Sequence, residues 1–124
     1  MIKILIIEDE APAQITLKRL IDKHCTDSRV VMTIASVRSA VKWLEENPEG
    51  ADVIFMDVEL SDGTCFEIFD KVDISAQIII TTAYDNYAIE AFRVNSVDYL
   101  LKPITEEELI RAWERCRERI EAKS

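Results

Sequence analysis

The sequence predicts an α/β fold, in which a parallel β-sheet is covered by helices on both faces. Short, continuous apolar runs recur along the 124 residues, and each has the length and β-rich content of a buried strand. Between these runs the apolar residues change to helical spacing, which is typical of repeated strand–helix units. We therefore expect five strands and five helices in strict alternation, forming one domain over residues 1–124.

The first two units occupy the N-terminal end of the chain. A buried strand over Lys3–Ile7 is followed by apolar residues at helical spacing between Ala13 and His24. The second strand, Val30–Ala35, is less apolar than the others and leads into a helix over Val37–Leu44. Ser36 is a residue type that commonly caps the N-terminus of a helix, so we expect this helix to begin directly after it.

The other three units follow the same pattern, with predicted strands at Val53–Met56, Ile78–Ile80 and Tyr99–Leu101. A loop over Val58–Gly63 connects the first of these strands to a short helix, and a capping box over Thr105–Glu108 begins the last helix. The residues expected to face inward from the three helices are Phe66, Phe69 and Val72, then Ala88, Ala91 and Phe92, then Leu109, Trp113, Cys116 and Ile120.

Topology rules favour one arrangement of these elements. Right-handed crossovers with short connections give a doubly wound sheet, and the flavodoxin-like strand order 2-1-3-4-5 is the natural solution for five units. In this order the first and third strands are neighbours at the point where the order reverses. Ligands bind at such a switch point in open α/β sheets.

Composition narrows the function classes. The chain has 48% hydrophobic and 31% charged residues, and no apolar stretch approaches the roughly 20 residues of a membrane-spanning helix. Met1-Ile2-Lys3 has no signal-peptide layout, so we expect a cytoplasmic protein without a membrane partner. The net charge of -9 argues against nucleic-acid binding by this segment on its own.

Scarce residue types exclude several kinds of site. Gly50 and Gly63 are the only glycines, so neither a dinucleotide fingerprint nor a Walker A loop fits. A single histidine disfavours a zinc site or a hydrolytic triad. The cysteines are odd in number and far apart, and we expect Cys25, Cys65 and Cys116 to be buried free thiols. Any metal should therefore be held by oxygen atoms.

Four predicted strands end in residues suited to phosphate or metal chemistry. Glu8 and Asp9 follow the first strand, Asp57 the third, Thr82 the fourth and Lys102 the fifth. The carboxyl ends of parallel strands meet at one edge of a sheet, so these side chains should converge. Three neighbouring carboxylates need compensating positive charge, and hard oxygen donors select Mg²⁺ or Mn²⁺.

This cluster fits phosphoryl transfer. Asp57 is the candidate nucleophile toward phosphorus, Lys102 can supply positive charge, and the Thr82 hydroxyl can donate a hydrogen bond to a phosphoryl oxygen. Simpler interpretations exist for each residue. Glu8 and Asp9 could cap the first helix, and Lys102 could be a surface lysine. The combination of all these residues favours function.

In this order and at these spacings, the residues resemble the receiver domains of two-component response regulators. The resemblance covers essentially the whole chain and is carried by Glu8-Asp9, Asp57, Thr82-Ala83, Tyr99 and Lys102-Pro103. Residues 81–85 and 91–103 look most like the LytTR-type (LytR/AlgR-like) subgroup. Members of that subgroup carry a C-terminal DNA-binding output domain, which we expect to be absent from this chain.

The resemblance implies the phosphoacceptor and the metal ligands. Asp57 would accept the phosphoryl group. Glu8, Asp9 and Asp57 would hold Mg²⁺, or Mn²⁺, together with the main-chain carbonyl of Glu59.

The resemblance also implies the residues that respond to phosphorylation. Thr82 would be the switch hydroxyl, and Lys102 would contact the phosphoryl group. Tyr99 matches the aromatic position whose rotamer reports activation. The Lys102–Pro103 peptide bond is expected to be cis.

By resemblance the chain is a signalling domain rather than an enzyme. A sensor histidine kinase would phosphorylate Asp57, and the face formed by the fourth helix, fifth strand and fifth helix would then rearrange and pair two receivers as a homodimer. DNA would be bound only through a downstream domain, giving transcriptional regulation. A Mg²⁺-dependent phosphatase of the haloacid dehalogenase type and an unphosphorylated pseudo-receiver are the alternatives.

One segment departs from the family. Receivers usually have a proline in the loop after the phosphoacceptor and a glycine eight residues on, whereas Val58–Gly63 lacks the proline and reaches its glycine in six. The shorter loop could change Mg²⁺ affinity or partner docking, because Glu59 lies within it. Glu59 and Tyr84 flank the site, and we expect them to tune the access of water to the phosphoryl group.

Overall fold

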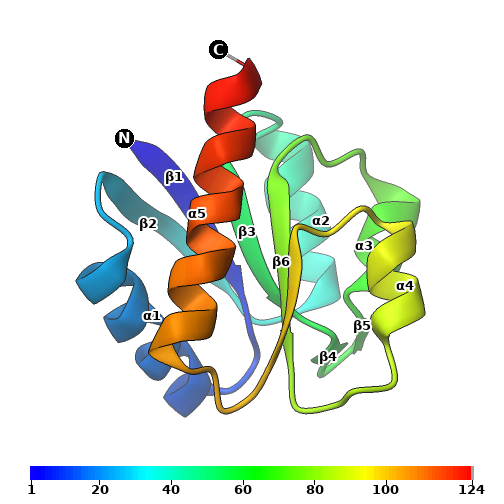
Figure 1. Ribbon diagram of the computed structural model, residues 1–124. Helices are drawn as coiled ribbons and strands as arrows, with labels where there is room; N and C mark the ends of the chain where they lie inside the picture. The colour runs from blue at the N-terminus through cyan, green and yellow to red at the C-terminus, as the bar shows by residue number, and fades with distance from the viewer. Residues whose placement is uncertain (124) are drawn as a thin grey trace.

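A parallel β-sheet forms the centre of the protein in the computed structural model, which describes residues 1–123 (Figure 1). Its strands are β1 (Ile2–Ile7), β2 (Ser28–Ile34), β3 (Val53–Asp57), β6 (Gln77–Thr82) and β7 (Asp98–Leu101). They run in the order β2-β1-β3-β6-β7, and every neighbouring pair is parallel. The predicted flavodoxin-like, doubly wound α/β fold is confirmed.

Helices cover both faces of the sheet (Figure 1). They are α1 (Ala11–His24), α2 (Val37–Glu46), α3 (Phe66–Lys71), α4 (Ala88–Arg93) and α5 (Glu106–Lys123). Buried residues of α1 and α5 share one apolar cluster, whereas those of α2, α3 and α4 share the other. Among the described residues, no helix has the length and apolarity needed to cross a bilayer.

Strand β3 lies in the middle of the sheet and is buried on both faces. Val53 and Phe55 contribute to the α1–α5 cluster, while Ile54 and Met56 contribute to the opposite cluster. All four side chains are fully buried, which explains why this strand is a continuous apolar run instead of an alternating one. Each of them stabilises the fold by about 1.5–3 kcal/mol through removal of apolar surface from water.

The predicted caps and thiols are confirmed. Ser36 Oγ accepts a hydrogen bond from the amide of Ser39 at 3.1 Å, and Thr105 Oγ1 accepts one from the amide of Glu108 at 3.2 Å. The three cysteines, Cys25, Cys65 and Cys116, are free and buried. Burial raises the pKa of each thiol to about 12, so they are protonated and unreactive at neutral pH.

The strict alternation of strands and helices is wrong after β3. The segment predicted as a loop forms a two-stranded antiparallel hairpin, β4 (Glu59–Leu60) and β5 (Gly63–Thr64). Gly63 has a φ of 149°, and a Cβ there would lie 2.1 Å from a carboxylate oxygen of Glu67. The shortened segment therefore closes as a tight turn that requires glycine.

The hairpin also completes the N-terminus of α2. The carboxylate of Asp62 accepts hydrogen bonds from the amides of Val37 at 2.7 Å and Arg38 at 3.0 Å, and Ser36 satisfies the next amide. The first three amides of a helix have no partner within the helix, so these side chains replace water at that end.

The predicted inward face of α4 is wrong at two positions. Phe92 is 85% exposed and Ala88 is also exposed, whereas Ala91 is buried. The inward stripe is instead formed by Tyr87, Ala91 and Val94, so the helix is rotated by about one position relative to the prediction. Apolar residues on both sides of a helix of six residues made its inner face ambiguous.

Replacing Asp62 with alanine should lower the free energy of unfolding by about 0.5–1 kcal/mol, because two amides of α2 lose their cap. Those amides, of Arg38 and then Val37, hold the pKa of Asp62 below its ordinary value. The stabilisation is therefore present above the ordinary carboxyl pKa and disappears as pH falls through the lowered one. Urea unfolding of the Asp62→Ala variant over this pH range, with Ser61→Ala as control, measures the effect; equal losses in both variants would contradict it.

Candidate functional site

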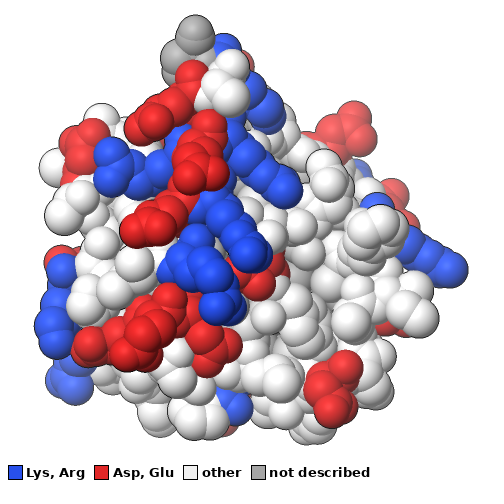
Figure 2. Space-filling view, in the orientation of Figure 1, with Lys and Arg blue, Asp and Glu red and all other residues white. Residues whose placement is uncertain are grey.

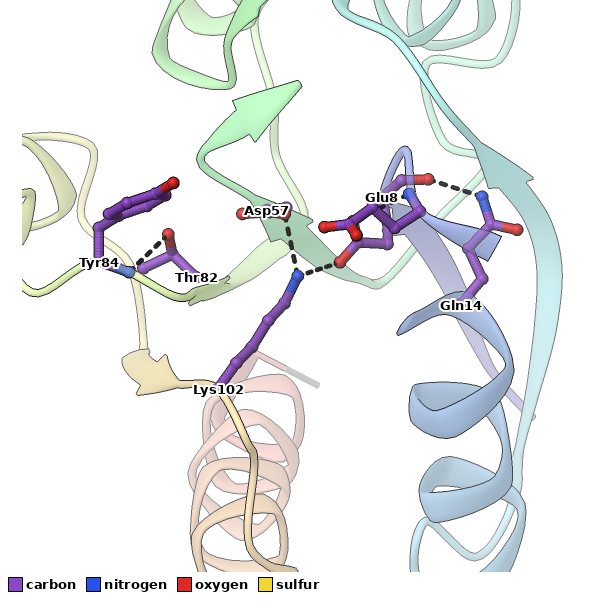
Figure 3. Close-up of polar contacts among 7 residues, drawn as sticks. Glu8, Gln14, Asp57, Thr82, Tyr84 and Lys102 are labelled. Atoms are coloured by element: carbon purple, nitrogen blue, oxygen red, sulfur yellow. Dashed lines mark hydrogen bonds and ion pairs between the residues drawn. The ribbon is translucent and has the colours of Figure 1, made fainter. Parts of the chain in front are cut away.

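The predicted site residues converge at the carboxyl edge of the sheet, with an ammonium group between two acids. Glu8 directly follows β1, Asp57 ends β3, and both are buried. Lys102, which follows β7, places its Nζ 3.0 Å from Asp57 Oδ2 and in hydrogen-bond contact with Glu8 Oε1 (Figure 3). The lysine is therefore not a surface residue but joins the ends of three strands.

Burial and charge oppose each other in this group. Burial raises the pKa of Glu8, its hydrogen bond from Lys102 lowers it, and the nearby charge of Asp57 raises it further, with a net rise. Burial alone would lower the pKa of Lys102, but hydrogen bonds to Glu8 and Asp57 outweigh it and raise this pKa. Two carboxylates thus share a single ammonium, and the site retains an affinity for additional positive charge.

Acidic oxygens beside this pair form a candidate cation site. One oxygen each from Glu8, Asp9 and Glu10 lies within 4.8 Å of the others. Glu8 is buried, whereas Asp9 and Glu10 are more open to solvent. An all-oxygen donor set fits Mg²⁺ or Mn²⁺. Glu10 was not predicted, although three consecutive acids at the end of a strand are a readable signal.

The alternative of Glu8 or Asp9 as the cap of α1 does not hold. The N-cap residue of α1 is Glu10, and its side chain makes no capping hydrogen bond. The Glu8 side chain accepts a hydrogen bond from the Glu10 amide at 3.2 Å, and its carbonyl accepts one from Gln14 Nε2 at 2.6 Å (Figure 3). These contacts fix Glu8 at the edge of the sheet.

Thr82 ends β6 on the side of Asp57 opposite Glu8 (Figure 3). It is fully buried, and its Oγ1 accepts a hydrogen bond from the amide of Tyr84 at 3.3 Å. Thr81 is the register partner of Asp57 in the sheet. Of the two threonines, Thr82 is thus the one whose hydroxyl is hydrogen-bonded to the segment that follows β6.

The two tyrosines predicted near the site contact each other. The hydroxyl of Tyr99, on β7, donates a hydrogen bond to the carbonyl of Tyr84, and Tyr84 itself is 49% exposed. Burial raises the pKa of Tyr99, which keeps its hydroxyl protonated as a donor at neutral pH. The neighbouring Lys102–Pro103 peptide bond is cis.

Glu59 lies at the start of β4, two residues after Asp57, and its side chain is bonded to Tyr87. Glu59 Oε2 accepts a hydrogen bond from the hydroxyl of Tyr87 at 2.8 Å, and this bond raises the pKa of Tyr87. Tyr87 was not predicted as a site residue. The sequence carries no signal for this contact, because it depends on the hairpin that replaces the expected loop.

Residues beyond the site form an exposed apolar surface on α4, β7 and α5, which we name the α4–β7–α5 surface. Its exposed members are Ile89, Phe92, Leu101 and Ile110. Charged side chains of both signs gather along α5, beside a largely uncharged surface toward α4 (Figure 2). Asp98 Oδ2 lies 3.1 Å from Arg115 Nη1 and 3.9 Å from Arg111 Nε. These ion pairs tie α5 to β7.

Residues 4–114 match the family described as the response regulator receiver domain. The chain belongs to this family. It is a receiver domain of two-component signalling, so the predicted resemblance is confirmed, and the site described above lies within the matched residues.

Known relatives support the same subgroup. The receiver is 35% identical over 113 residues to the sensory transduction protein LytT of Bacillus anthracis, and 33% identical over 109 residues to the sensory transduction protein LytR of Streptococcus agalactiae. The alignments cover 89% and 85% of this chain but only 45% and 44% of those proteins. The chain thus spans less than half the length of these relatives.

Solved structures agree with the fold. The response regulatory domain of protein mrkE from Klebsiella pneumoniae superposes with a TM-score of 0.83 at 30% identity, covering 97% of this chain and 98% of that one. A response regulator receiver domain protein from Clostridium thermocellum has the same TM-score at 25% identity, with both chains fully covered.

Replacing Lys102 with alanine should destabilise the receiver at neutral pH by about 1–3 kcal/mol, because Glu8 and Asp57 lose their shared cation. A carboxyl whose pKa is raised in the folded state binds protons on folding, so stability should recover as pH falls and Glu8 is protonated. Urea unfolding at neutral and mildly acidic pH measures this. Lys23→Ala, which removes an exposed lysine, is the control; a Lys102→Ala variant as stable as this control at neutral pH would contradict the prediction.

Proposed function

We propose that this receiver accepts a phosphoryl group on Asp57 from a phosphohistidine of a sensor histidine kinase. An Asp57 oxygen attacks phosphorus, the P–N bond breaks, and its electron pair returns to the imidazole. The observation that supports this most strongly is the Lys102 ammonium held between Asp57 and Glu8. A fixed positive charge beside the acceptor stabilises the charge that develops on the phosphoryl oxygens.

The acidic residues would hold Mg²⁺, or Mn²⁺ in its place. Glu8, Asp9 and Asp57 would supply carboxylate oxygens, and the main-chain carbonyl of Glu59 would supply a fourth protein ligand, with Glu10 adding negative charge beside them. When bound, the cation neutralises charge on the carboxylates and on the transferred group. This role agrees with the raised pKa of Glu8, because burial leaves its negative charge only partly compensated.

Phosphorylation would act on the rest of the domain through Thr82 and Tyr99. A phosphoryl oxygen is a strong acceptor for the proton of the Thr82 hydroxyl. The oxygen of the same hydroxyl accepts a hydrogen bond from the Tyr84 amide, so turning the hydroxyl toward the phosphoryl group would change that contact. The Tyr84 carbonyl is in turn bonded by Tyr99. Phosphorylation would thus shift the population between two arrangements of this segment. Glu59 and Tyr84, which flank the site, would tune the access of water and hence autodephosphorylation.

We further propose that residues 1–124 are a single receiver domain that controls a LytTR-type DNA-binding output domain outside this chain. Its function would be cytoplasmic transcriptional regulation, with DNA bound only through that domain and no membrane partner. The similarity to LytT and LytR supports this proposal. The chemistry is that of a signalling domain and not of an enzyme with a separate substrate.

Acetyl phosphate and Mg²⁺ should convert the receiver to a singly phosphorylated adduct, measured by intact mass. Asp57→Asn should abolish the adduct, because the amide is a poor nucleophile, whereas Asp73→Asn, an exposed acid away from the site, should keep it. Rapid multiple turnover of acetyl phosphate would favour the phosphatase alternative. Absence of any adduct would favour the pseudo-receiver and contradict the proposal.

Activation should also pair two receivers through the α4–β7–α5 surface, which exposes Phe92 and three other apolar side chains. Beryllofluoride, a phosphoryl mimic, should raise the dimer fraction in analytical ultracentrifugation. Phe92→Ser should reduce this rise because it removes apolar area from the interface, while Ile15→Ser, which alters an exposed residue on α1, should not. A dimer fraction that beryllofluoride leaves unchanged would count against the homodimer.

A further inference from the structure

Tyr87 links the chain segment that follows the phosphoacceptor strand β3 to the segment that follows the neighbouring strand β6. The hairpin follows β3, which ends at Asp57, and the segment 83–87 follows β6, which ends at Thr82. The strands are paired neighbours in the sheet. Within residues 1–123, the 2.8 Å bond from the Tyr87 hydroxyl to Glu59 is the one side-chain hydrogen bond between the hairpin and residues 83–93.

The ring of Tyr87 is held in place on two sides. Its centroid lies 6.1 Å from that of Phe66 and 6.5 Å from that of Tyr84, the latter in an edge-on arrangement. It also packs against the apolar cluster of α2, α3 and α4. A ring that is already ordered loses little side-chain entropy when its hydroxyl makes a hydrogen bond, so the contact to Glu59 is well positioned.

Of the two segments that Tyr87 joins, the β4–β5 hairpin is anchored by more side-chain hydrogen bonds to the rest of the fold than residues 83–87. Asp62 joins it to the first amides of α2, and Glu67 accepts a hydrogen bond from the Thr64 amide at 2.7 Å. Residues 83–86 are all exposed. The Tyr84 amide donates a hydrogen bond to the Thr82 hydroxyl, and the Tyr84 carbonyl accepts one from the Tyr99 hydroxyl. Tyr87 thus ties residues 83–87, which carry the proposed switch contacts, to the anchored hairpin.

We propose that Tyr87 is a positioning residue that holds Glu59 and residues 83–87 together at the mouth of the site, and thereby slows hydrolysis of phosphorylated Asp57. This role rests on the proposed function. In hydrolysis a water oxygen bonds to phosphorus, the P–O bond to Asp57 breaks with its electron pair returning to the carboxylate, and the protons of water pass to the released phosphate and the solvent.

Loss of the Tyr87 hydroxyl would promote this reaction in two ways. The attacking water must approach in line with the breaking bond. Glu59 and Tyr87 belong to the segments that follow Asp57 and Thr82, and releasing these segments from each other would open the surroundings of the phosphoryl group to water. A Glu59 carboxylate without its tyrosine partner would also be free to accept a hydrogen bond from that water. Both effects shorten the lifetime of the phosphorylated form.

The test follows loss of the phosphoryl group by intact mass after phosphorylation with acetyl phosphate and Mg²⁺ and removal of the donor. Tyr87→Phe keeps the ring packing and should shorten the lifetime roughly three- to tenfold. In a Glu59→Ala background the same substitution should change nothing. Glu67→Ala, which removes a different hydrogen bond of the hairpin, should leave the lifetime unchanged. Amide NMR spectra establish that each variant is folded.

Any result that differs from these expectations contradicts the role of Tyr87. An unchanged or longer lifetime in Tyr87→Phe overturns it, and so does an equal shortening in Glu67→Ala or in the Glu59→Ala background. A wild-type chain that forms no adduct overturns the proposed function together with this role. An adduct that forms normally but has the same lifetime in Tyr87→Phe overturns only the role of Tyr87.

Discussion

The site depends on one ammonium group placed between two buried carboxylates. Glu8 and Asp57 approach each other because β1 and β3 are neighbours in the sheet, and their charges would repel without a cation. At a separation of about 4 Å and an effective dielectric constant near 20, two unit charges interact by about 4 kcal/mol. Lys102 offsets this repulsion from the end of β7, which has no direct pairing with either strand. The edge of the sheet is thus held together electrostatically across three strands, and the same charge distribution suits a phosphoryl group.

The parallel sheet explains why such distant residues meet. Strands buried on both faces must be apolar along their length, so polar residues can enter only where the strands end. Since parallel strands end at the same edge, their first polar residues gather there. The chemistry of this site is therefore a direct consequence of the topology.

The same reasoning defines what could be predicted. The continuous apolar strands and the Ser36 cap follow from short-range patterns. The strand order and the convergence of Glu8, Asp57, Thr82 and Lys102 follow from topology rules. The orientation of α4 was missed, because a helix of six residues with apolar side chains around it has no clear inner stripe. The hairpin after β3 was missed because its strands contain only two residues each, too few for any periodicity. Tyr87 was missed as a consequence, since its partner lies on that hairpin.

The shortened loop after β3 folds as the β4–β5 hairpin and contacts two neighbouring parts of the chain. Its turn at Gly63 requires a backbone angle that other residues rarely adopt, and the two strands place Asp62 and Glu59 at different ends of the same small structure. Asp62 faces α2, whereas Glu59 faces Tyr87 in the segment before α4. The loop that differs from the family therefore connects β3, which carries Asp57, to α2 and to the segment before α4. A change in the length of this loop alters the surroundings of Asp57 without replacing any side chain of the site.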